Sequence, residues 1–126
     1  MGQNLKFVLK FARNQSETIA MIRHIVLFSA KSPSDLDAVI EGLSLLTTIP
    51  YARKLEIARN AKTDPFGNDI DVIVYGEFED EAALAAYKSH PTYMESIRRV
   101  RPIREIRVAA HYETNGAVTT NLTDVE

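Results

Sequence analysis

The chain has 126 residues, a formal net charge of −2 at neutral pH and no cysteine. A chain of this length fits one domain with a sizeable core, and its charge gives no electrostatic reason to bind nucleic acid or an anionic membrane, so we expect neither partner. Without cysteine, disulfides, thiolate metal sites and cysteine nucleophiles are all excluded.

The first segment is predicted to be an appendage. Leu5 to Phe11 alternates with a period of two, which is typical of a strand, and its apolar run is too short for a signal peptide or a membrane span. Met21 stands directly before the first strong strand pattern. We therefore expect a cytoplasmic protein with an appendage at residues 1–20, a folded domain at 21–113 and a polar tail at 114–126.

The domain shows four strand patterns and two helical regions. Ser34 is the expected N-cap of the first helix and Asp80 that of the second, and prolines stop the helical patterns. Asn115-Gly116 favours a marginal hairpin turn. In chain order we expect a strand at 22–28, a helix from Ser34 towards Pro50, strands at 52–59 and 72–78, a loop at 60–69 between them, a helix from Asp80 to Pro91, an apolar helical stripe at Tyr93, Ile97 and Val100, and a strand at 103–112.

This order of elements defines an α+β fold. The sequence β-α-β-β-α-β is the ferredoxin-like split βαβ arrangement, a four-stranded antiparallel sheet with both helices on one face. The other face is then bare, and its apolar residues need a cover, so we expect a homodimer in which two sheets enclose an interior. The residues assigned to the bare face are Ile22, Val26 and Phe28, with either Val72 and Val74 or Ile73 and Tyr75.

A few residues carry possible chemistry. His24 lies in an apolar strand, where it is either a hydrogen-bonded core residue or a base. Tyr87 is either a packing residue or an acid. His90 precedes a proline at a helix end, where an imidazole can brace the last carbonyls. Arg107 is a rim residue or a ligand clamp. The arginines at 98, 99, 101 and 104 are interpreted as a solvated helix face.

Four blocks of the sequence, at residues 21–28, 71–80, 86–91 and 100–105, together resemble the stress-responsive A/B barrel domain family. The resemblance implies a dimeric α+β barrel. Similarity to the plant polyketide cyclase of this family implies an aldol-type ring closure that uses a histidine base and a tyrosine. The matching positions in this chain are His24, Tyr87 and His90.

The chain departs from the cyclase pattern His-Pro-x-His. It has His90-Pro91-Thr92-Tyr93, and a tyrosine with an ordinary pKa of about 10 is a poor base at neutral pH. His111 stands where relatives often carry aspartate, and alternation places it on the predicted bare face with Arg107. An imidazole directed from there into the barrel would replace the one missing at Tyr93.

Two classes of function remain. The favoured one is a barrel that binds a small apolar or aromatic molecule. The alternative is an enzyme, either a cyclase-like lyase or a cofactor-free or haem-using monooxygenase. No ligand spacing supports a metal, and we assign no cofactor. The candidate catalytic residues are His24, Tyr87 and His111, and the candidate ligand-binding residues are His24, Tyr87, His90, Tyr93, Arg107 and His111.

Overall fold

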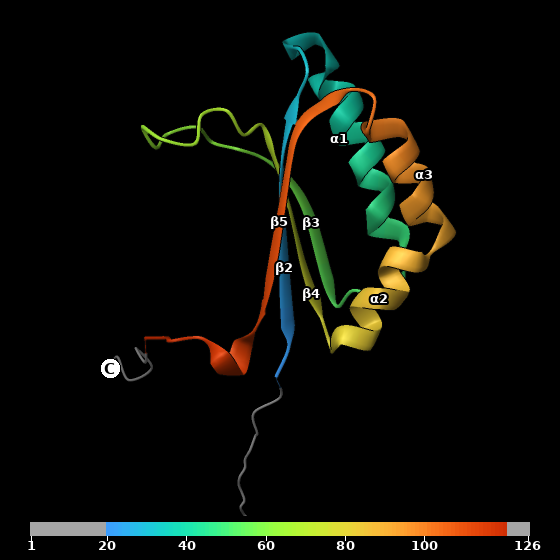
Figure 1. Ribbon diagram of the computed structural model, residues 1–126, viewed down its shortest axis with the longest axis vertical. Coiled ribbons are helices and arrows are strands. Elements are labelled where there is room, and N and C mark those ends of the chain that lie inside the picture. Colours follow the sequence, from blue (N-terminus) through green and yellow to red (C-terminus); the bar gives the residue numbers. More distant parts are fainter. Residues whose placement is uncertain (1–19, 121–126) are drawn as a thin grey trace, which may run out of the picture.

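The computed structural model describes residues 20–120. The strand-like pattern of Leu5 to Phe11 and the last part of the predicted tail lie outside these residues. The described chain forms one sheet with its α-helices on the same side (Figure 1). None of the helices between residues 20 and 120 is long and apolar enough to cross a membrane.

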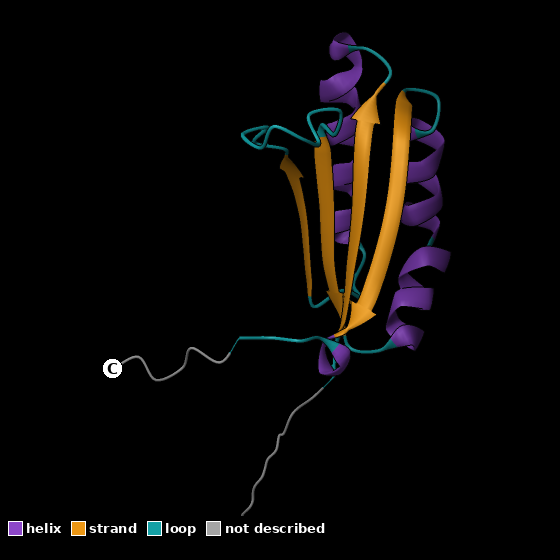
Figure 2. Cartoon of the chain, turned by 60° about the vertical axis from the view of Figure 1, so that its left-hand side comes forward, coloured by secondary structure: helices purple, strands orange, loops and turns teal. Residues whose placement is uncertain are grey.

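The sheet has the predicted topology. Its strands follow the order β3-β4-β2-β5, and every neighbouring pair is antiparallel (Figure 2). The α+β ferredoxin-like fold is therefore confirmed, and the third predicted strand has the predicted bounds. The strands are β2 (Ile22–Ala30), β3 (Lys54–Arg59), β4 (Val72–Phe78) and β5 (Arg104–Glu113).

The helices pack against one face of this sheet. The predicted N-cap of α2 is confirmed, because the Asp80 carboxylate accepts a hydrogen bond from the backbone N–H of Ala83 at 2.9 Å. The apolar stripe predicted after Pro91 is a helix of its own, α3. The helices are α1 (Leu36–Ser44), α2 (Glu81–Ser89) and α3 (Pro91–Val100), with short 3-10 turns at Pro33–Asp35 and Leu45–Thr48.

Two local predictions are wrong. Ser34 does not cap α1, because a 3-10 turn that begins at Pro33 already holds it in a helical conformation, and the N-cap is Asp35. Asn115-Gly116 does not turn a hairpin, because Thr114–Gly116 forms a 3-10 turn and no strand follows it in residues 117–120. The Thr114 N–H donates to the Met21 carbonyl at 2.8 Å, which closes the β2–β5 ladder at this point.

The core lies between the sheet and the helices. Ile22, Val26 and Phe28 are each no more than 6% exposed and face the helices, so their assignment to the bare face is wrong. A strand that is apolar on both sides gives no alternation from which its two faces can be told apart, and a shift of one residue exchanges them. Of the two options for β4, Ile73 and Tyr75 are the outward pair.

The side of the sheet away from the helices has an apolar centre, with charged residues such as Arg23 and Glu77 beside it. Leu27 lies between Ile73 and Val108 in the register, and Ile25 lies between Tyr75 and Ala110. Val108 is 55% exposed, which is high for a valine in a strand. We call this surface the open face and define it by its side chains Ile25, Leu27, Ile73, Tyr75, Val108, Ala110 and Tyr112.

Candidate functional site

A cavity of about 170 Å³ lies between the sheet and the helices. Most of its wall is apolar. Four polar side chains, in addition to the arginines, reach it from the strands and helices. Three arginines line it as well. The apolar wall consists of Val26, Phe28, Leu43, Leu46, Val74, Ile97 and Val100, the polar side chains are His24, Tyr87, Tyr93 and Ser96, and the arginines are Arg101, Arg104 and Arg107.

The cavity brings together part of the predicted site. His24, Tyr87, Tyr93 and Arg107 line it, whereas His90 and His111 do not. The cavity also lies on the helix side of one sheet, not between two sheets as the sequence suggested. His24 is buried on the helix side of β2, and the register pairs it with His111, so His111 also faces the helices. The prediction that His111 lies on the bare face is wrong.

His24 sits between two rings. It is 2% exposed, and its ring centroid lies 6.4 Å from that of Phe78 and 5.6 Å from that of His111. Its Nδ1 is buried and has no hydrogen-bond partner among the described residues. Burial, followed by electrostatic interaction with Lys88, His111 and Arg107, lowers the pKa of His24 to about 4. The imidazole is thus neutral at pH 7 and a weak base.

Tyr87 joins this ring cluster from α2. It is 1% exposed, and its ring lies 4.9 Å from Phe78 and 5.2 Å, edge to face, from Tyr93. Burial, followed by the neighbouring Tyr93, raises the pKa of Tyr87 above its ordinary value. The phenol therefore keeps its proton and is suited to donate a hydrogen bond to a molecule in the cavity.

His90 is the single residue between α2 and α3. Its Nδ1 accepts a hydrogen bond from the backbone N–H of Thr92 at 3.1 Å, so the imidazole caps the start of α3. This differs from the prediction that it would brace the last carbonyls of α2. The ring lies 6.2 Å from that of Tyr51. These contacts describe a residue that fixes the junction of two helices.

Replacing His90 tests this capping contact. His90→Ala removes the acceptor of the Thr92 N–H, so we expect the free energy of unfolding to fall by about 1 kcal/mol, the typical loss for an N-cap. His90→Asn keeps a side-chain acceptor and should restore most of that stability. Urea denaturation of both variants measures the effect. Equal losses in the alanine and asparagine variants would show that the cap is not what His90 contributes.

His111 is directed to the helix layer at a different place. Its Nε2 lies 3.4 Å from Oε2 of Glu81 at the start of α2, and its side chain is 36% exposed. Although its ring contacts His24, it is not part of the cavity wall. His111 is therefore not placed to supply the imidazole that Tyr93 lacks.

Two of the arginines in the cavity wall are not among the residues predicted for the site. Of the cluster interpreted as a solvated helix face, Arg98 and Arg99 do pair with Glu95 on the surface of α3. Arg101 and Arg104 instead line the cavity. Nothing in the sequence distinguishes the two surface arginines from the two that line the cavity. Within residues 20–120, no group of three or more histidine, aspartate or glutamate side chains is arranged to hold a metal ion.

Fold and cavity together define a ferredoxin-like α+β domain with room for a small molecule beneath its helices. Residues 22–114 match the model of the stress-responsive A/B barrel domain, and the chain belongs to this family. A comparison with curated proteins finds no match.

Solved structures with the same fold include a protein of this family from Mesorhizobium loti, described as having a ferredoxin-like fold. It is 28% identical, with a TM-score of 0.63 over 74% of this chain and 95% of that one. A dimeric ferredoxin-like protein of unknown function from Thermobifida fusca is 24% identical, with a TM-score of 0.64 over 81% and 98%. The hydroxynitrile lyase of Passiflora edulis is 19% identical, with a TM-score of 0.66 over 81% and 100%. The last two likenesses concern the fold alone.

Proposed function

We propose that this protein binds a small apolar or aromatic molecule in the cavity between its sheet and its helices. The observation that carries the proposal is a mainly apolar cavity of about 170 Å³, partly open to solvent, which His24 and Tyr87 line. An apolar cavity of about 150 Å³ is known to hold one benzene ring. The Tyr87 hydroxyl, which keeps its proton, would donate a hydrogen bond to a polar substituent on such a ring.

A cyclase-like lyase is the second candidate, because His24 and Tyr87 line the same cavity. Catalysis of this kind needs a base whose pKa lies near the working pH. His24, with a pKa of about 4, does not provide one. The second histidine of the cyclase pattern is replaced in this chain by Tyr93. Binding without catalysis is therefore favoured.

A cavity-filling variant tests the binding proposal. Ile97→Phe on α3 enlarges a side chain of the cavity wall, and we expect it to weaken the binding of p-cresol at least tenfold. Met94→Phe on the same helix is the matched control, because Met94 is 55% exposed and should leave the affinity unchanged. Chemical shifts of backbone amides during titration report both the affinity and the place of binding.

Two results would contradict the proposal. One is the absence of p-cresol binding to the wild-type protein at millimolar concentration. The other is equal binding by Ile97→Phe and the wild type, since a ligand inside the cavity must compete with the added ring. Thermal melting of each variant confirms that it is folded before its affinity is compared.

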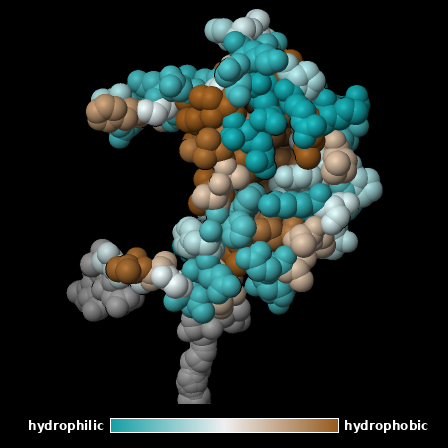
Figure 3. Space-filling view, in the orientation of Figure 1, coloured by the Kyte–Doolittle hydropathy of each residue, from teal (hydrophilic) through white to brown (hydrophobic). Residues whose placement is uncertain are grey.

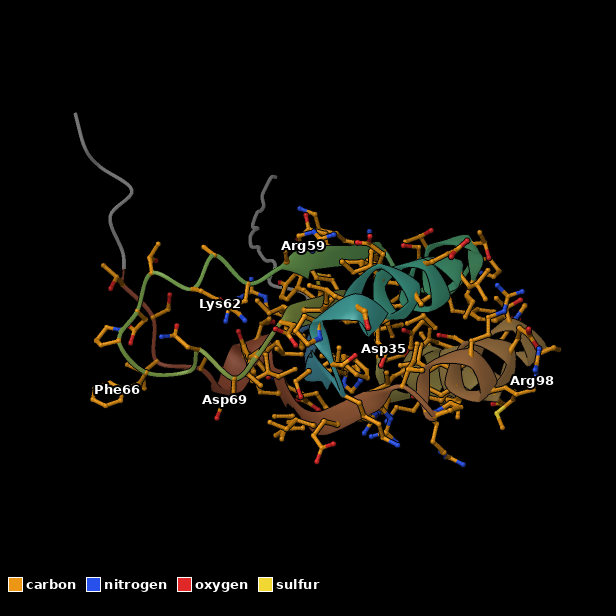
Figure 4. All side chains as sticks on the ribbon, turned by 90° about the horizontal axis from the view of Figure 1, so that it is seen from above. Asp35, Arg59, Lys62, Phe66, Asp69 and Arg98 are labelled. Carbon is orange, nitrogen blue, oxygen red and sulfur yellow. The ribbon has the colours of Figure 1, made fainter. Side chains whose placement is uncertain are left out.

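A second copy of the chain is the proposed cover of the open face. Figure 3 shows apolar side chains on a concave side of the molecule, and Figure 1 shows that the loop after β3 and the segment after β5 extend on this same side of the sheet. In Figure 4, Phe66 lies at the far end of that loop, and it is 84% exposed. The structural relatives from Bacteroides fragilis and Thermobifida fusca are described as dimeric. Together these features support a homodimer that pairs the two sheets.

A further inference from the structure

Three positive charges converge on the wall of the cavity. Arg101 is the C-cap of α3, and Arg104 and Arg107 belong to the first half of β5. Among the described residues, none of the three forms an ion pair, while arginines elsewhere on the molecule do, as Arg59 does with Asp37 and Arg98 with Glu95. The cavity therefore carries positive charge that no carboxylate of the described chain neutralises.

A β-bulge gives the cavity two of these arginines. Side chains three residues apart on a regular strand point to opposite faces, so Arg104 and Arg107 would be separated by the sheet. The ladder shifts between Phe28, which pairs with Arg107, and Ala30, which pairs with Arg104. The extra residue turns both arginines to the helix side, as bulges near functional sites often do.

The bulge is held by a specific contact. Ser29 is 5% exposed, and its hydroxyl accepts a hydrogen bond from the backbone N–H of Ile106 at 3.0 Å. This bond satisfies a donor within the irregular part of the ladder. A built feature of the sheet, and not a chance rotamer, thus places the two arginines at the cavity.

Holding these guanidinium groups together is electrostatically unfavourable. Burial, followed by the charges of Arg107 and Arg101, lowers the pKa of Arg104. Arginine does not lose its proton in proteins, so an anion bound beside these side chains would reduce their mutual repulsion. A fork of arginine N–H donors matches the oxygens of a carboxylate or a phosphate.

We infer, on the basis of the proposed function, that the ligand is an amphipathic anion. Its carboxylate or phosphate binds Arg101, Arg104 and Arg107, and its aromatic or aliphatic body fills the apolar part of the cavity beside Tyr87 and Val100. The arginines thereby restrict the ligand class from any small apolar molecule to acids.

A matched pair of probes tests this assignment. 3-Phenylpropionate and 3-phenyl-1-propanol share an apolar body and differ in charge, and calorimetric titration measures the affinity of each. We expect the acid to bind about tenfold to a hundredfold more tightly, as charge-assisted hydrogen bonds provide. 2-Phenylethyl phosphate is the third probe, and its affinity relative to the acid tells whether the site prefers a phosphate or a carboxylate.

Variants of the arginines test which residues cause the preference for the acid over the alcohol. Arg104→Gln and Arg107→Gln should each reduce the affinity for the acid about tenfold or more, although Arg107 is the more exposed of the two arginines. The affinity of each variant for the alcohol should change less than twofold. Arg98→Gln is the control and should change neither, because Arg98 lies on the side of α3 away from the sheet (Figure 4). The acid preference should also shrink in 0.5 M NaCl.

The possible failures are distinguishable. Equal affinity of the wild type for acid and alcohol would overturn the anion assignment and leave the proposed function in place. Retention of the acid preference in both Arg104→Gln and Arg107→Gln would also overturn it. Absence of binding by all three probes, while p-cresol still binds, would overturn this inference alone, and absence of binding by p-cresol as well would overturn the proposed function too.

Discussion

Acidification from pH 7 to pH 4 is expected to remove about 2–3 kcal/mol of folding free energy through His24 alone. The pKa of His24 is about 4 in the folded protein, against 6.5 for the unfolded residue. Below pH 6.5 the unfolded chain takes up a proton that the folded chain does not, so stability falls as the pH decreases through this window. Below pH 4 both states bind the proton, and the contribution stays constant at its reduced value.

A difference between two proteins isolates this contribution. Carboxylates also titrate on acidification, so the pH dependence of the wild type is compared with that of His24→Leu by urea denaturation at several pH values. The His24→Leu variant should lack the part of the fall in folding free energy between pH 6.5 and pH 4 that His24 causes. His111→Gln, which changes a more exposed histidine, should retain it. Identical pH profiles of the wild type and His24→Leu would show that His24 is not held neutral by the fold.

Leu27→Asp is expected to convert the proposed dimer into a monomer at micromolar concentration. Leu27 lies on the open face between Ile73 and Val108, so in a dimer of sheets the new carboxylate would be buried in an apolar interface. Burying an unpaired carboxylate costs several kcal/mol, and about 4 kcal/mol corresponds to a thousandfold rise in the dissociation constant. The protomer should stay folded, because Leu27 is outside the core between sheet and helices.

Sedimentation measures this change directly. The wild type should sediment near twice 14.1 kDa and the variant near 14.1 kDa. Met94→Asp introduces the same charge at an exposed position of α3 and should remain a dimer. A wild type that stays monomeric at micromolar concentration would refute the dimer, and a Leu27→Asp variant that stays dimeric would place the interface on another surface.

The sequence by itself determined the elements and their order. The β-branched run from Val72 to Phe78 and the capping side chain of Asp80 act within a few residues of the chain, so their effects are readable from composition and spacing. Because the order of such elements restricts the topologies that a short chain can adopt, the ferredoxin-like sheet followed. His24, Tyr87, Tyr93 and Arg107 were singled out from the sequence, but their place in one cavity was not.

Only the tertiary structure decided which way the strands face. β2 is apolar on both sides, so the packing of the helices, and not alternation, turned Val26 and His24 inward and left Leu27 outside. On β5, a bulge that depends on the pairing partner turned Arg104 to the same side as Arg107. The cavity and its charge thus arise from long-range pairing between strands distant in the chain, whose register no local pattern specifies.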